Sequence, residues 1–151
     1  MRCLPALAVS LLAACSGDDE HTDPDVDCTK VSGADEFVVG LAKDGGGGKL
    51  DFAMMSAEPA PPARGDNTWI VSINDMNGAP LEGAALTVTP FMPAHQHGTP
   101  ITVKITPADA PGQYSLSPVN LWMPGVWETT IRATSMAGTE TDSALYTFCI
   151  N

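Results

Sequence analysis

Residues 68–75 read TWIVSIND, and this stretch decides the fold class because apolar and polar side chains alternate along it. Successive side chains of a β-strand point to opposite faces of its sheet, so the alternation predicts a half-buried strand. Asn77 and Gly78 follow almost at once. That dipeptide favours the tight turn of a β-hairpin, since both residues tolerate a positive φ. The segment therefore predicts a strand and a turn within an antiparallel sheet.

Similar short runs recur on both sides of this strand, separated by Gly, Pro, Asn and Asp. We expect further strands at residues 37–43, 50–55, 84–91, 99–106, 113–121, 126–134 and 143–150. The Pro-rich residues 58–65 are expected outside any sheet, and Pro90 is expected to close its strand. Short strands at this spacing predict an all-β fold, an immunoglobulin-like antiparallel β-sandwich of about seven strands. A small closed barrel is the alternative.

The first residues have the architecture of an export signal. Arg2 precedes a short apolar run that ends in small residues before Cys15. Residues 12–15 (LAAC) resemble the lipobox of bacterial lipoproteins. The resemblance implies cleavage after residue 14 and a lipid, palmitate among its acyl chains, on Cys15. Ser16 in place of Asp leans toward the periplasmic side of the outer membrane rather than the inner membrane.

The full sequence is acidic, and the part that follows the signal suits one domain. Seven basic residues stand against 18 acidic ones, for a net charge of −11. Such a surface argues against nucleic-acid binding, because phosphates would repel it. We expect residues 1–14 to form the signal peptide and 15–27 (CSGDDEHTDPDVD) a lipidated, solvated tether. Residues 28–151 are then the β-sandwich domain.

The cysteine count leaves one pair. Cys3 departs with the signal and Cys15 carries lipid, so Cys28 and Cys149 remain. In an oxidising compartment such a pair is expected to form a disulfide. Two free thiols acting as metal ligands are the alternative.

Candidate metal-ligating side chains fall in two short segments. The first contains Met92, His95 and His97, and the second contains Met123. In an extended chain, side chains two residues apart point to the same side, so the two imidazoles can share one ion. Imidazole combined with thioether suits copper, and thioether favours Cu(I). The residues alone leave an alternative open, in which the histidines lie in a loop that binds no metal and both methionines pack in the core.

Four motifs carry a resemblance to a known family. They are the runs WIVSINDxxGxPLEGA at 69–84, MPxHxHG at 92–98, GQY at 112–114 and MPGVW at 123–127. In order and spacing they resemble YtkA-like domains over about residues 65–135. Those domains are similar to the periplasmic part of FixH proteins, which are linked to copper-oxidase assembly. The resemblance implies an immunoglobulin-like sandwich with copper bound at Met92, His95, His97 and Met123, although no second methionine lies between the histidines.

These observations support one function and one alternative. The first is an envelope-anchored lipoprotein that handles copper or assists oxidase assembly, exchanging metal with a donor or acceptor protein. The alternative is a metal-free immunoglobulin-like interaction module of the cell envelope. We do not expect an enzyme, because the sequence has no G-x-S-x-G, HExxH, P-loop or dinucleotide motif.

Overall fold

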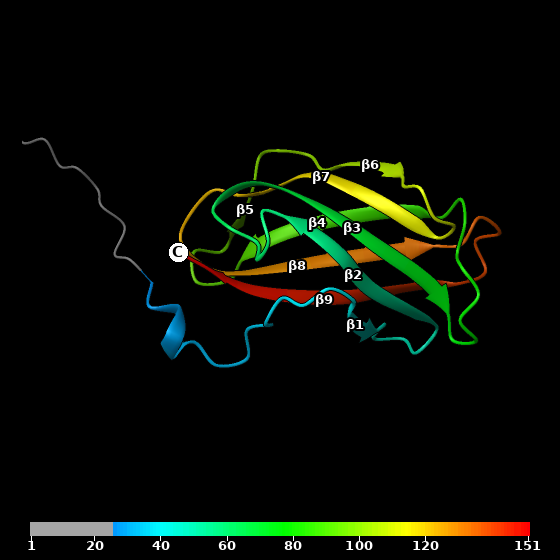
Figure 1. Ribbon diagram of the computed structural model, residues 1–151, viewed down its shortest axis with the longest axis horizontal. Coiled ribbons are helices and arrows are strands. Elements are labelled where there is room, and N and C mark those ends of the chain that lie inside the picture. Colours follow the sequence, from blue (N-terminus) through cyan, green and yellow to red (C-terminus); the bar gives the residue numbers. More distant parts are fainter. Residues whose placement is uncertain (1–25) are drawn as a thin grey trace, which may run out of the picture.

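The computed structural model describes residues 26–151, so the predicted signal peptide, Cys15 and most of the predicted tether lie outside the described residues. The strands are β1 (Leu41–Asp44), β2 (Leu50–Glu58), β3 (Gly65–Asp75), β4 (Ala85–Met92), β5 (His97–Gly98), β6 (Lys104–Pro107), β7 (Gln113–Leu121), β8 (Gly125–Thr134) and β9 (Thr141–Ile150). One sheet has the order β1-β2-β3-β7-β6 and the other β5-β4-β8-β9. All the paired strands are antiparallel. The two layers confirm the β-sandwich over the closed barrel (Figure 1).

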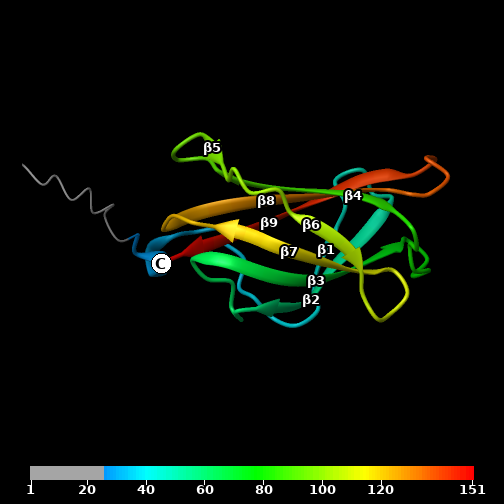
Figure 2. The same ribbon diagram turned by 90° about the horizontal axis from the view of Figure 1, so that it is seen from above.

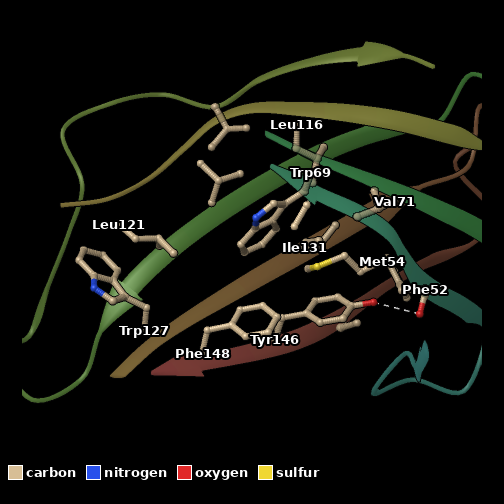
Figure 3. Close-up of a cluster of buried hydrophobic side chains, with 14 of the residues drawn as sticks. Phe52, Met54, Trp69, Val71, Leu116, Leu121, Trp127, Ile131, Tyr146 and Phe148 are labelled. Carbon is tan, nitrogen blue, oxygen red and sulfur yellow. Dashed lines mark hydrogen bonds between the residues drawn. The ribbon is translucent and has the colours of Figure 1, made fainter. Parts of the chain in front are cut away.

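The core lies between the two sheets and follows from the alternation in the sequence. In β3 the side chains of Trp69, Val71 and Ile73 are fully buried, whereas the residues between them are only half-buried. In the other sheet, β8 alternates in the same way and buries Trp127 and Ile131. Figure 3 shows Trp69 and Tyr146 among these side chains, with the Tyr146 hydroxyl donating to the Phe52 carbonyl oxygen at 3.0 Å.

Three strand predictions differ from the structure. The expected strand 37–43 is replaced by β1, which begins only at Leu41, and Val38 and Val39 are exposed. The expected strand 99–106 is likewise confined to β6, which begins at Lys104. Pro90 does not end its strand, since β4 continues to Met92. It is tolerated because β5 pairs only with the last two residues of β4, which leaves Pro90 at a free sheet edge.

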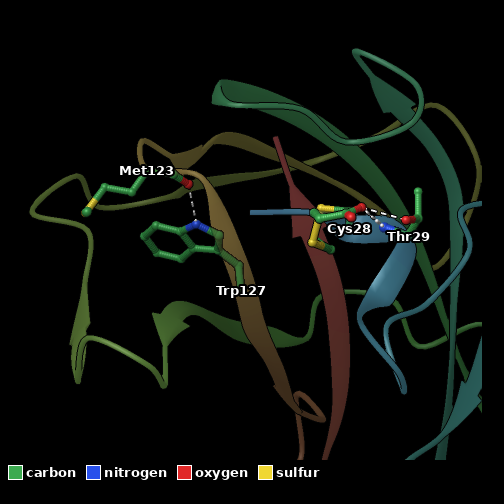
Figure 4. The surroundings of a disulfide bond; sticks show 6 residues. Cys28, Thr29, Met123 and Trp127 are labelled. Carbon is green, nitrogen blue, oxygen red and sulfur yellow. Dashed lines mark hydrogen bonds between the residues drawn. A yellow bond between two sulfur atoms is a disulfide. The ribbon is translucent and has the colours of Figure 1, made fainter. Parts of the chain in front are cut away.

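A disulfide joins the two ends of the domain. Cys28 lies in the short 3₁₀ helix η1 (Cys28–Lys30), and its sulfur is bonded to that of Cys149 in β9. Figure 4 shows this bond beside η1. The predicted pairing is thus confirmed, and neither sulfur is available as a thiolate ligand. Among residues 26–151, no helix has the length and apolar character needed to cross a bilayer.

Candidate metal site

The two histidines lie on the hairpin that joins β4 to β5. Met92 and His97 are paired across this hairpin, and residues 93–96 form its loop. The His95 amide donates to the Met92 carbonyl oxygen at 3.2 Å. Gln96 has a φ of 54°, so the chain reverses between the histidines instead of being extended there, as their spacing had predicted. Both views place the hairpin at the end of the sandwich where the C-terminus lies (Figures 1 and 2).

The imidazole rings nevertheless lie close together. Their centroids are 5.6 Å apart and their planes are nearly perpendicular, at 84°. A metal–nitrogen bond is about 2 Å long, so one ion can reach a nitrogen of each ring after a modest rotation. The exposed His95 in the loop is free to make that rotation, whereas His97 is half-buried.

A backbone contact determines which His97 nitrogen is available. Nδ1 of His97 lies 3.0 Å from the carbonyl oxygen of Gly98. A carbonyl oxygen can only accept a hydrogen bond, so Nδ1 must carry the proton of the neutral ring. The lone pair is then on Nε2. Metal-binding histidines typically donate one ring N–H to a carbonyl or carboxylate in this way.

Two tryptophans surround the His97 ring. Trp122 stacks on it, with ring centroids 5.3 Å apart and planes inclined by only 23°. Trp127 approaches edge-on at 6.1 Å. Trp122 is 42% exposed, whereas Trp127 is fully buried. The imidazole therefore sits at the boundary between the sandwich core and solvent.

The two methionines are more deeply placed than the histidines. Met92 is 1% exposed, and its position opposite His97 puts both side chains on the same face of the sheet. Met123 is 7% exposed, and its carbonyl oxygen accepts a hydrogen bond from Trp127 Nε1 at 2.9 Å (Figure 4). The structure thus brings His95, His97 and Met92 together. Met123 directly follows Trp122, which stacks on His97, and its carbonyl oxygen contacts Trp127.

Two features of the site were not foreseen from the sequence. The Gly98 carbonyl contacts the neighbouring His97 ring through the local direction of the backbone, and the Trp122 ring reaches it from a distant turn. Residue spacing reveals neither contact. A third finding concerns charged ligands: within residues 26–151, no group of three or more His, Cys, Asp or Glu residues is arranged to hold an ion. Two imidazoles with thioethers nearby are a ligand set that suits copper, whereas other metals are typically bound by carboxylates or thiolates.

Comparisons with known proteins place the chain in a family. A family model described as YtkA-like matches residues 44–132, a span that contains the hairpin and both tryptophans. No curated protein matches the sequence. Among solved structures, PcoC, a methionine-rich copper resistance protein from Escherichia coli, is 19% identical, with 65% of this chain and 96% of that chain covered and a TM-score of 0.44.

A second solved structure is a copper-bound variant of FetP from uropathogenic Escherichia coli strain F11. It is 12% identical, covers 67% of this chain and 89% of that chain, and has a TM-score of 0.43. FetP of the same strain in its as-isolated form is 11% identical, with coverages of 77% and 92% and a TM-score of 0.43. The family match spans more than half of the sequence and confirms the resemblance seen in the motifs. The chain belongs to the YtkA-like family.

Proposed function

We propose that this protein is a copper-binding domain of the cell envelope, with His95 and His97 as its principal ligands. The observation that carries the proposal is the hydrogen bond between His97 Nδ1 and the Gly98 carbonyl oxygen, which leaves Nε2 as the metal-binding nitrogen. The His95 ring lies beside it on the same hairpin. Imidazole is a good ligand for copper, and the hairpin end is open to solvent for loading.

The methionines extend this site toward Cu(I). Met92 is the cross-strand partner of His97, with its buried thioether beside Gly125, and Met123 lies in the turn that precedes β8. Soft thioethers select Cu(I), whereas Cu(II) relies on the imidazoles. The proposed set of Met92, His95, His97 and Met123 therefore holds Cu(I) through nitrogen and sulfur. Cu(II) is held through the two rings alone.

The proposal includes an anchor and a transfer role rather than catalysis. Cys15 carries lipid on the periplasmic side of the outer membrane, and residues 16–27 tether the domain to it. The bound copper passes to or from a donor or acceptor protein by ligand exchange, in metal handling or oxidase assembly. The exposed His95 is the ligand best placed to move first, because it lies in the loop rather than in a strand.

The experiment is a copper titration of the purified protein under oxidising and reducing conditions. The wild type is compared with His95→Ala/His97→Ala and with His21→Ala, which removes the third histidine of the chain. We expect one tight equivalent in the wild type and in His21→Ala, and its loss in the double variant. Equal binding by all three proteins would contradict the assigned ligands. Mass spectrometry of the intact mature protein tests the lipid on Cys15 separately.

A metal-free interaction module is the competing function, and the burial of both methionine side chains favours it. Met92 and Met123 are placed as core residues would be, and thioethers pack well against aromatic rings such as Trp127. This alternative predicts no tight copper binding in any variant. It also predicts that in-cell crosslinking from the hairpin end recovers one defined envelope protein.

A further inference from the structure

The indole of Trp122 covers one face of the His97 ring. The offset-parallel stack, with centroids 5.3 Å apart and an angle of 23°, is the arrangement that aromatic pairs prefer. The side chain is 42% exposed, so it remains at the surface instead of completing the core. The Gly98 carbonyl oxygen restrains the same imidazole through Nδ1. The two contacts together restrain the rotation of the ring and leave Nε2 as its metal-binding atom.

Trp122 is itself held by contacts that do not involve the histidines. The Arg64 guanidinium donates from Nε to the Trp122 carbonyl oxygen at 3.0 Å. The next residue, Met123, accepts the hydrogen bond from the buried Trp127 indole. The turn between β7 and β8 is therefore anchored to the start of β3 and to the core. The backbone that carries the Trp122 indole is therefore held independently of the histidines.

From this geometry we infer that Trp122 is a positioning residue of the copper site: it holds the His97 imidazole ready for metal and shields one face of the ring from water. The inference rests on the proposed copper-binding function. Residues that orient a metal ligand typically contribute about 10-fold to 100-fold in metal affinity. An imidazole that is already oriented loses less rotational freedom when it binds metal. Removal of the indole should therefore weaken copper binding although every copper ligand remains.

The test compares Trp122→Ala and Trp122→Phe with the wild type. Leu145→Ala is the matched control, because Leu145 is an equally exposed apolar residue, at 43%, in the middle of β9. The first measurement is made without metal, by NMR of the His97 ring protons. A stacked indole shifts these protons upfield. We expect Trp122→Ala to lose the shift, Trp122→Phe to retain part of it, and Leu145→Ala to leave it unchanged.

The second measurement is the copper dissociation constant of the same four proteins. We expect Trp122→Ala to weaken binding at least 10-fold, with faster copper release, and Trp122→Phe to recover most of the loss. Unfolding midpoints measured alongside exclude a general loss of structure. Tight wild-type binding that is unchanged in Trp122→Ala would overturn the inference and leave the copper function intact. Absence of binding in the wild type would overturn both.

Discussion

Gly125, the first residue of β8, lies beside Met92 of the β4–β5 hairpin and near Val26 at the start of the described chain. Its replacement by alanine should lower the stability of the fold. Gly125 has a φ of +135°, a conformation that side chains other than glycine rarely adopt. A Cβ added there would lie 2.7 Å from the terminal methyl of Met92 and 3.9 Å from the Val26 side chain. The backbone strain costs about 1–3 kcal/mol. Displacing a methyl in a core that is already filled adds about 1–3 kcal/mol.

We therefore expect Gly125→Ala to lower the free energy of unfolding by about 2–6 kcal/mol, measured by urea denaturation. Gly48→Ala is the control, because its φ is also positive, at +63°, and an added Cβ would meet nothing within 4 Å. That variant should lose only about 1–2 kcal/mol. In a double-mutant cycle with Met92→Val, which removes the methyl, the Gly125→Ala penalty should shrink by about 1–3 kcal/mol. Equal penalties at the two glycines, or an additive cycle, would refute the contact.

Three further predictions concern the disulfide, a buried carboxylate and the thioethers. The bond between Cys28 and Cys149 closes a separation of 121 residues and so lowers the conformational entropy of the unfolded chain. Cys28→Ser/Cys149→Ser should therefore lose at most about 5 kcal/mol of unfolding free energy in the same urea assay. A gain in unfolding free energy would contradict this prediction. Burial acts to raise the pKa of Asp142, but four backbone N–H groups donate to its carboxylate and hold the pKa below its usual value. The stability that this carboxylate contributes is present above about pH 4, where Asp titrates in the unfolded chain, and it is lost as the pH falls through the lower folded pKa. The wild type should therefore exceed Asp142→Asn in unfolding free energy at pH 6, and the difference should narrow below pH 4. A difference that does not depend on pH would contradict this prediction. Met92→Leu, a swap of similar volume, should weaken Cu(I) binding in a competition assay and leave Cu(II) binding unchanged, whereas equal effects on both oxidation states would exclude Met92 as a ligand.

The strand at residues 68–75 was predictable because the alternation of apolar and polar side chains follows from the burial of one strand face between two sheets. The residues FVV at 37–39 led to a wrong strand prediction, because their propensity did not reflect burial. They have strong β propensity, yet Val38 and Val39 are exposed, and Gly40, with a φ of +82°, comes before the chain enters β1. Strand propensity depends on pairing partners that the local sequence does not contain. The disulfide was predictable by counting, because the expected export signal and lipid anchor account for the other two of the four cysteines.

The candidate site was only partly accessible from the sequence. The spacing of His95 and His97 correctly suggested that the rings lie close together, although the reversal at Gln96 brings this about rather than an extended strand. The tautomer of His97 depends on the Gly98 carbonyl, whose direction is set by the hairpin. The stacking of Trp122 depends on a turn 25 residues further along the chain. The Trp122 contact arises from tertiary structure, so no local sequence pattern encodes it.

The location of bound copper on the protein is the decisive test of the proposed site. Cu(II) broadens the NMR signals of nearby nuclei, so a small fraction of an equivalent added to the protein maps the site. We expect the signals of His95, His97 and the Trp122 indole to broaden first, while those of Met136 and Gly138, in the β8–β9 turn at the opposite end of the sandwich, remain sharp (Figure 1). Broadening centred elsewhere, or spread evenly over the acidic surface, would contradict a copper site on the β4–β5 hairpin.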